Sequence, residues 1–298
     1  AEAPPPLARL ACWRAADGTQ RLLLSAHHLA GDAASLSLLV ERFAAAWREG
    51  RLAPQASLVA SARRQPDAAA ARAYWSKVLE SPPTLPPGRG DDGGAEVVET
   101  GFDTTALAAA AAAAGCTPAA WAAAAWARSL GLVCGTRRPV FWHYHAGRDG
   151  GNAGVVGPLL VPVPLCLPLD DHLPHQVTTA LDAGWRHARQ PRRQIAAWAG
   201  WPAGLALGTS LNVLGGLLHP VTLEPGLRLT PVPLQERDSD LEDGTLIEAT
   251  CDLASGRLRL QRVPQLVSRQ VADDLLHAWE QHCQLPAGIP VRQGADAW

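Results

Sequence analysis

The feature that most limits the fold of this chain is a junction in residues 21–43, RLLLSAHHLAGDAASLSLLVERF. An apolar, strand-like run enters the residues HHLAGD, and a helical pattern begins directly after them. Asp32 is placed to cap that helix and Gly50 to end it. A strand that passes so quickly into a helix favours a mixed α/β fold. The helical period is carried by apolar residues at Leu36, Leu39, Val40, Phe43, Ala44 and Trp47.

The residues on either side of this junction predict further elements. Residues 7–15 and 19–26 are apolar runs separated by the turn residues Ala-Asp-Gly, which predicts a β-hairpin. A second helix is expected over residues 66–80.

A proline- and glycine-rich segment, SPPTLPPGRGDDGG at residues 81–94, predicts a linker. We therefore expect residues 1–80 to form one domain and residues 95–285 to form another. Residues 286–298 are expected to be a loose tail.

Strand-like and helical patterns also alternate beyond the linker, so both parts are expected to be mixed α/β layers. The run at 155–169 alternates apolar residues with proline, which is typical of an edge or irregular strand. Trp121 and Trp126 lie on an alanine-rich helical stretch and are expected in the core. Other expected strands are 96–102, 138–145 and 205–216, and expected helices are 104–115, 117–133, 175–190 and 268–283.

Composition excludes several classes of function. Lys plus Arg is 26 and Asp plus Glu is 28, so no basic excess indicates a nucleic-acid partner. The most apolar stretch, residues 104–129, is interrupted by Gly115 to Pro118, so no membrane span is expected. The first ten residues lack the pattern of a signal peptide. The six cysteines are scattered, which suggests neither a zinc site nor disulfides and favours a cytoplasmic protein.

His28 has two interpretations. A histidine at the end of a strand is commonly a structural residue with its hydrogen bonds satisfied. A histidine on a strand-to-helix turn can also project into a cleft, and its ordinary pKa of about 6.5 suits general-base chemistry near neutral pH. The nearby Asp32 could hold the loop or fix a ring tautomer.

The motif HHLAGDA resembles the HHxxxDG motif of the condensation domains of nonribosomal peptide synthetases. Other segments resemble the same family in the right order. They are ARAYWSKVL at 71–79, FWHYHAGRDGGNAGVVGPLLVPVPL at 141–165 and GTSLNVLGG at 208–216. The resemblance covers residues 7–285.

This resemblance implies a function and a fold. The fold would be two lobes like chloramphenicol acetyltransferase, arranged in a V around a tunnel. Carrier proteins would deliver an acyl or peptidyl thioester and an amine on phosphopantetheine arms. The chain itself would bind no cofactor and no metal.

The resemblance also implies site residues. His28 would be the catalytic histidine, and His27 would be structural. Asp32 would orient the loop through a salt bridge, with Arg148 as its partner. Residues Ala33, Gly157, Ser210 and Asn212 would line the tunnel.

The chain departs from the family pattern in three ways. Ala33 stands where the family has glycine, and Val161 to Val163 replace the family's Val-Asn-Thr. The histidine motif begins at residue 27, whereas the family places it well inside the first lobe. Much of that lobe is therefore expected to be missing, supplied by a second chain, or lost in a degenerate domain.

Two other groups of residues are candidates for function. His143 and His145 share a face of one strand, but a metal site would need a third ligand. Arg192 and Arg193 form a short basic patch, which is expected to be a solvated surface or a contact for an acidic carrier protein.

The best-supported hypothesis is an acyltransferase of the condensation type that forms an amide in nonribosomal peptide or antibiotic biosynthesis. An ester-forming or free-acceptor acyltransferase of the same superfamily is the first alternative. A truncated, non-catalytic docking domain is the second.

Overall fold

The computed structural model describes most of the chain: residues 6–52, 54–55, 57–58, 67–91, 96–149, 151–215, 219–232, 241 and 244–284. The chain divides into two compact units. Unit 1 contains Ala1–Gln65, Ala146–Leu160 and Leu217–Pro233, and unit 2 contains Pro66–His145, Val161–Gly216 and Leu234–Trp298.

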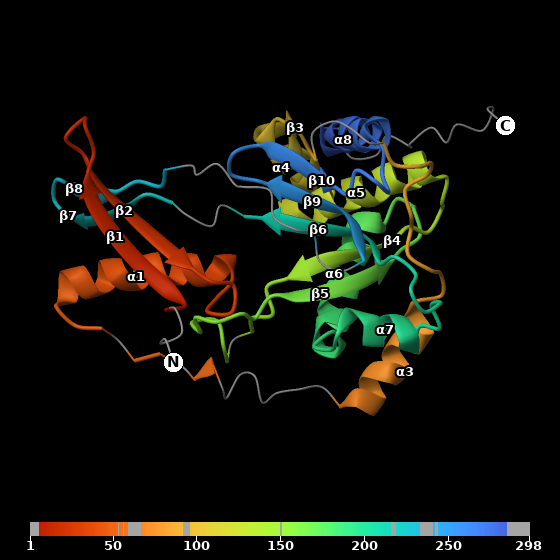
Figure 1. The fold of residues 1–298 in the computed structure, drawn as a ribbon, viewed down its shortest axis with the longest axis horizontal. Helices are drawn as coiled ribbons and strands as arrows, with labels where there is room; N and C mark the ends of the chain where they lie inside the picture. The colour runs from red at the N-terminus through yellow and green to blue at the C-terminus, as the bar shows by residue number, and fades with distance from the viewer. Residues whose placement is uncertain are drawn as a thin grey trace. The chain divides into compact units, whose positions relative to one another are not determined.

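Unit 1 is built from two strand pairs and a helix (Figure 1). Strands β1 (Ala8–Arg14) and β2 (Gln20–Ala26) form the expected antiparallel hairpin. Strands β7 (Val221–Glu224) and β8 (Leu227–Leu229) form a second antiparallel pair, and β7 lies beside the helix. That helix is α1 (Ala33–Glu49).

Helix α1 begins and ends where the sequence predicts. The Asp32 side chain accepts a hydrogen bond from the Ser35 backbone N–H, and the Ser35 side chain accepts one from the Asp32 N–H. This reciprocal capping box satisfies N–H groups that lack partners within the helix. Gly50 closes the helix with a φ of 67°, a left-handed conformation that glycine adopts without steric cost.

Unit 2 contains a six-stranded mixed sheet in the order β3-β10-β9-β6-β4-β5. The pairs β4–β6 and β6–β9 are parallel, and the remaining pairs are antiparallel. The predicted mixed α/β class is therefore confirmed. The strands are β3 (Val97–Gly101), β4 (Val140–His145), β5 (Val161–Cys166), β6 (Gly208–Leu214), β9 (Thr245–Asp252) and β10 (Arg257–Arg262).

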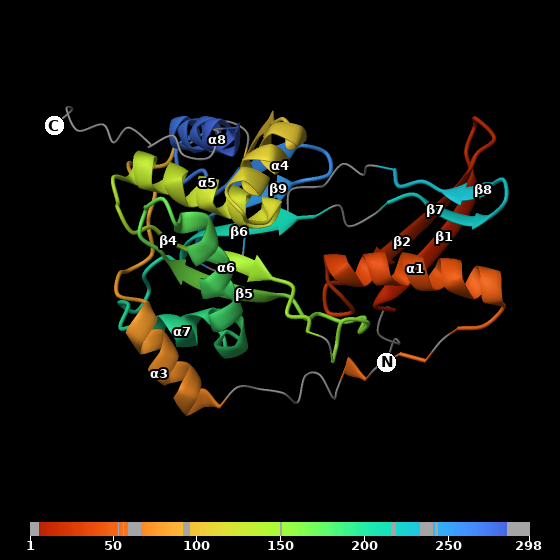
Figure 2. The same ribbon diagram turned by 180° about the vertical axis from the view of Figure 1, so that it is seen from behind.

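Helices cover the apolar face of this sheet, as seen from behind in Figure 2. Helix α5 packs on β6, α6 packs on β5, and α8 packs on β3 and β10. Helix α4 contacts α5 and α8, while α3 packs against α7. These helices are α3 (Ala68–Val78), α4 (Thr104–Ala113), α5 (Pro118–Cys134), α6 (Leu173–Gly184), α7 (Arg192–Trp198) and α8 (Arg269–Gln284), and Trp185–His187 form the short 3₁₀ helix η1.

The core of unit 2 lies between α5, α8 and the sheet. Trp121 and Trp126 are buried on α5 as predicted, and the Trp126 ring lies 5.0 Å from that of Trp279 on α8. Large aromatic side chains bury much apolar area, so this pair contributes strongly to the stability of the unit.

Strand β5 is an edge strand, as its prolines predicted. Pro162 and Pro164 lie opposite Tyr144 and Trp142 on β4. A proline cannot donate to the sheet ladder, so an edge position is where it can be accommodated.

The division into units differs from the boundary expected at residues 81–94. Helix α3 belongs to unit 2, because Trp75 Nε1 donates to the His187 carbonyl and Ser76 Oγ donates to the Trp198 carbonyl. Residues 81–91 contain no helix or strand, but they are tied to the sheet: Thr84 N–H donates to the Val140 carbonyl, and Thr84 Oγ1 accepts from the Val140 N–H. The expected tail at 286–298 lies outside the described residues.

None of the described helices is by itself long and apolar enough to cross a membrane. Helices α4 and α5 have the length and apolar composition of a membrane span only when taken together, and they are bent by 95° at the break between them. That break contains Gly115, Cys116 and Thr117, and Pro118 begins α5.

Candidate active site

The two histidines lie in the turn that joins β2 to α1. The His27 N–H donates to the Leu7 carbonyl at 2.7 Å, and its carbonyl accepts from Ala30 N–H at 2.8 Å. His27 Nδ1 accepts from the Leu29 N–H at 3.1 Å, so this nitrogen carries no proton. The His27 ring therefore holds the shape of the turn, which is the structural position expected for it.

His28 occupies the next position of this turn, and its side chain is exposed. Its ring forms no hydrogen bond within the part of the chain that the structure describes. Leu29, which follows it, is 69% exposed. Both nitrogens of the His28 ring can therefore engage another molecule or exchange a proton with one.

Asp32 is fully engaged by the protein. It is buried, and its Oδ1 accepts from Ser35 N–H, Ser35 Oγ–H and Arg148 Nη2 at 2.8–2.9 Å. Its Oδ2 accepts from Arg148 Nη1 and from the N–H groups of Leu159 and Leu160 at 2.9–3.0 Å. With five N–H donors besides the Ser35 hydroxyl, the carboxylate has no lone pair left for a substrate proton.

The partner expected for Asp32 is in place. Arg148 contacts both Asp32 oxygens, and its side chain is only 10% exposed. Burial raises the pKa of Asp32, but the hydrogen bonds from Arg148 and Ser35 outweigh it, so the pKa lies below its ordinary value. Asp32 is therefore ionised near neutral pH, which suits a structural ion pair.

The loop that carries Arg148 has an internal scaffold. Gly147 adopts a φ of 64°, and its carbonyl accepts from Asn152 Nδ2 at 3.2 Å. Asn152 Oδ1 accepts from the Asp149 N–H at 2.6 Å. The buried Asn152 thus fixes the turn that aims the arginine.

Two more side chains of unit 1 hold the same loop. Arg42 Nη2 donates to the Gly154 carbonyl at 3.2 Å, and Gln55 Nε2 donates to the Val156 carbonyl at 3.3 Å. Together with Asp32 and Ser35 they fix the backbone of residues 154–160, which we call the anchored loop.

Sequence reasoning missed Ser35. Its hydroxyl contacts Asp32, Arg148 and Gly157, and the residue is 1% exposed. The signal available was Asp32 followed three residues later by a serine, which can form a capping box.

The residues expected to line a tunnel lie in different surroundings. Ala33 is the first residue of α1 and is half-buried. Gly157 is buried, and its N–H donates to Ser35 Oγ at 3.0 Å. Ser210 and Asn212 are on β6 in unit 2, where Ser210 is fully buried and Asn212 half-buried. Their role as tunnel lining stays a prediction.

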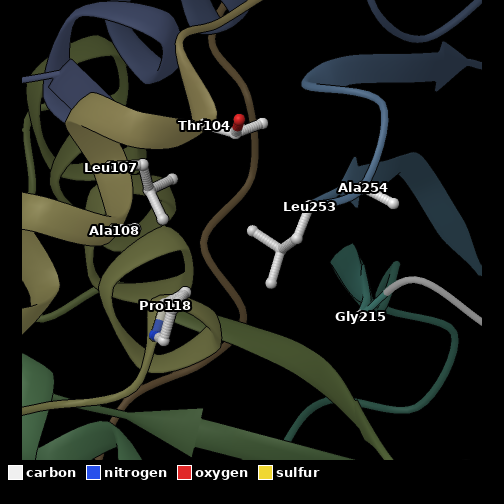
Figure 3. Close-up of a pocket in the computed structure, with 7 residues that line it drawn as sticks. All are labelled: Thr104, Leu107, Ala108, Pro118, Gly215, Leu253 and Ala254. Atoms are coloured by element: carbon white, nitrogen blue, oxygen red, sulfur yellow. The ribbon is translucent and has the colours of Figure 1, made fainter.

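A pocket of about 290 Å³ lies in unit 2, separate from these candidates (Figure 3). Its lining is mostly apolar, and none of the predicted site residues contributes to it. The lining residues are Thr104, Leu107, Ala108, Pro118, Gly215, Leu253 and Ala254.

His143 and His145 have structural surroundings. His143 is buried, its Nδ1 donates to the Tyr144 carbonyl at 2.9 Å, and burial lowers its pKa to about 4. The His145 ring stacks on Trp185, and burial lowers its pKa as well. Within the described residues, no three His, Cys, Asp or Glu side chains are grouped so that they could hold a metal ion.

The basic pair on α7 is not a simple solvated patch. The Arg192 guanidinium lies 4.6 Å from the centre of the Trp142 ring, and its Nη1 donates to Thr245 Oγ1 at 2.9 Å. Arg193 is exposed, but its Nη1 donates to the Leu205 carbonyl. The expectation of a solvated surface was wrong for Arg192. Its guanidinium stacks on the Trp142 ring through a cation–π contact, so it packs against the protein instead of projecting into solvent.

The fold matches several solved structures. The first condensation domain of the calcium-dependent antibiotic synthetase, solved with a substrate analogue, gives a TM-score of 0.65 at 22% identity. That match covers 94% of this chain and 70% of the other. The starter condensation domain of rhizomide synthetase, solved with C8-CoA, gives 0.68 at 19% identity, over 95% of this chain and 71% of the other.

The chain has the condensation-domain fold. The epimerization domain from the third module of tyrocidine synthetase B shares this fold, with a TM-score of 0.63 at 18% identity over 94% of this chain and 71% of the other. No family model matches the sequence, and no curated protein matches it either. The condensation-domain fold is thus established by structure, and the chemistry has to be argued from the residues.

Proposed function

We propose that the chain catalyses condensation-type acyl transfer. A carrier-bound acyl or peptidyl thioester would be joined to an amine, which forms an amide in nonribosomal peptide biosynthesis. The observation that carries the proposal is the exposed His28 ring, which forms no hydrogen bond within the described residues, together with the fully engaged Asp32, in a chain with the condensation-domain fold.

The chemistry needs one group that handles a proton. The amine nitrogen attacks the thioester carbonyl carbon, a C–N bond forms, and the carbonyl oxygen becomes an oxyanion. His28 accepts the proton that the nitrogen loses. When the intermediate collapses, the C–S bond breaks, and His28 returns the proton to the departing thiolate. A positioned imidazole can accept a proton and later donate it, which suits both steps.

Asp32 and Arg148 act on the shape of the site. Because Asp32 is saturated with hydrogen bonds, it cannot take the proton from the amine. The ion pair instead fixes the start of α1, to which the His28 turn is attached. Orientation of this kind can supply several kcal/mol of the barrier reduction.

Carrier proteins are the proposed partners. Their phosphopantetheine arms would enter as parts of the two substrates, so the chain would need no cofactor of its own. The starter condensation domain of rhizomide synthetase was solved with C8-CoA, an acyl thioester, and this supports a thioester donor here. A cytoplasmic location stays a prediction.

We also propose that further polypeptide, on a second chain or in a longer form of this one, covers the β1–β2 hairpin. Every residue of β1 is exposed, and the exposed side chains include Leu10 at 62%, Trp13 at 46% and Leu22 at 44%. Exposed apolar side chains gathered on a two-stranded hairpin indicate a missing partner surface.

The test is an assay that identifies the product. Purified protein is incubated with an acyl thioester of N-acetylcysteamine or of a carrier protein, together with amine or alcohol acceptors, and products are identified by mass spectrometry. The proposal predicts an amide. An ester would support the ester-forming alternative. A thioester whose acyl group is epimerised but not transferred would support the chemistry named for the tyrocidine synthetase domain. A protein that binds a carrier but turns over no thioester would be a docking domain.

A further inference from the structure

We propose that Ser35 is a positioning residue for this reaction, acting through the His28 turn and the anchored loop. The effect of Ser35 on the reaction rate rests on the proposed function. Its effect on the His28 turn and the anchored loop rests on contacts within unit 1. The Ser35 hydroxyl touches no reacting group. It links the two segments that carry His28 and Arg148.

The hydroxyl is a junction of hydrogen bonds. Three donors lie within reach of its oxygen, which has two lone pairs: Arg148 Nη2 at 3.1 Å, Gly157 N–H at 3.0 Å and Asp32 N–H at 3.3 Å. Its single proton has two acceptors within reach, the Asp32 Oδ1 at 2.9 Å and the Gly157 carbonyl at 3.0 Å. No aliphatic side chain can replace a group that both donates and accepts in this way.

Ser35 also controls how the chain enters α1. The bond from the Asp32 N–H to Ser35 Oγ fixes the backbone immediately after the His28 turn. A Cβ atom at Gly31 would lie only 2.7 Å from the Ser35 Cβ, so the turn packs directly on Ser35. A shift of the serine therefore moves the turn that presents His28.

The same hydroxyl clamps the anchored loop through Gly157. The Gly157 N–H donates to it at 3.0 Å, and the Gly157 carbonyl lies 3.0 Å from it, although Gly157 is more than a hundred residues away along the chain. Asp32 holds the loop one step further on, at Leu159 and Leu160. Loss of the hydroxyl would remove the partner of the Gly157 N–H while leaving the Asp32–Arg148 pair able to form, and the Gly157 carbonyl would keep its contact with Arg148 Nη2.

A matched control exists in unit 2. Ser129 is also fully buried, donates to the Ala125 carbonyl at 2.8 Å, and lies 3.0 Å from His282 Nδ1. Ser129→Ala removes a buried hydroxyl whose two hydrogen-bond partners, Ala125 and His282, both belong to unit 2. It controls for the general cost of losing such a group.

The experiment compares Ser35→Ala, Ser35→Thr and Ser129→Ala in two measurements. The first is amide hydrogen exchange, where S35A is expected to speed exchange at Gly157 by about tenfold or more, while Leu159 and Leu160 stay protected. The second is steady-state kinetics on the thioester and amine. S35A is expected to lower kcat by about 100-fold with little change in KM, S35T to recover most of kcat, and S129A to retain it.

The two measurements separate the two claims. If wild-type protein forms no amide but S35A still speeds hydrogen exchange at Gly157, the proposed function fails. The structural role of Ser35 in holding Gly157 is then still supported. Unchanged exchange at Gly157 in S35A would overturn the clamp. Equal losses of kcat in S35A and S129A, or no recovery in S35T, would overturn the positioning role.

Discussion

Arg148 donates a hydrogen bond to each carboxylate oxygen of Asp32, at 2.9 and 2.8 Å, across 116 residues of sequence. Both side chains are nearly inaccessible, at 10% and 1%. This pair joins the loop at 146–160 to the start of α1 and so assembles unit 1 from distant segments.

Arg148→Met should therefore be strongly destabilising. It leaves a buried carboxylate without its counter-ion, which typically costs about 3–5 kcal/mol. Arg138→Met is the control, because Arg138 pairs with Glu80 at a similar 2.8 Å but with side chains 44% and 58% exposed. Removal of an exposed pair costs at most about 1 kcal/mol. Urea unfolding measures the free energy of unfolding of both variants. Equal losses would show that the buried pair stabilises the fold no more than the exposed pair does.

The pKa of Asp32 predicts an acid-dependent loss of stability. Because its pKa is lower in the folded chain than the ordinary 3.8, the carboxylate stabilises the fold above pH 3.8. This stabilisation is lost as the pH falls through the folded-state pKa. The stability difference between wild type and Asp32→Asn should shrink between pH 5 and pH 2 (roughly the range over which such a pair titrates). A difference that stays constant over this range would contradict the prediction.

His282 predicts a second pH effect, at higher pH. Burial lowers the pKa of His282 to about 4 from 6.5. Between these two pH values the histidine is protonated in the unfolded chain but neutral in the folded chain. Stability should fall as the pH drops from 6.5 to 4, by up to about 1.4 kcal/mol per pH unit for this one group. His282→Gln should flatten that slope, whereas His277→Gln, on the exposed face of α8, should not. Equal slopes in the two variants would refute the assignment.

A side chain at Gly157 would force the Leu58 side chain to move. A Cβ at residue 157 would lie 2.4 Å from Leu58 Cδ1 and 3.0 Å from its Cδ2. Gly157→Ala should lower the melting temperature, and the added change Leu58→Ala should recover part of the loss. A double-mutant cycle measures this coupling. Additive effects would mean that the two residues do not touch.

Local structure was predictable because its causes are local. Asp32 and Gly50 bound α1 as expected, since capping depends on the residues at the helix ends. The edge position of β5 followed from Pro162 and Pro164, which cannot donate to a sheet ladder. The hairpin followed from its turn residues.

Tertiary structure was predictable only through the resemblance to a family. Nothing in the spacing of Asp32 and Arg148 indicates that they meet, and the pairing came from that resemblance. Ser35 was missed because its importance lies in Gly157, a distant backbone group. Helix α3 was placed in the wrong unit because Trp75 donates to His187, a contact that no local pattern reveals.

The most direct test of the account is the single-turnover rate of amide formation in His28→Ala. The matched control is His219→Ala, an exposed histidine in the same unit. If His28 is the general base, H28A lowers the rate by about 10²–10⁴-fold, the usual contribution of such a group, while H219A keeps the wild-type rate. A folded H28A protein that forms the amide as fast as wild type would contradict the central claim.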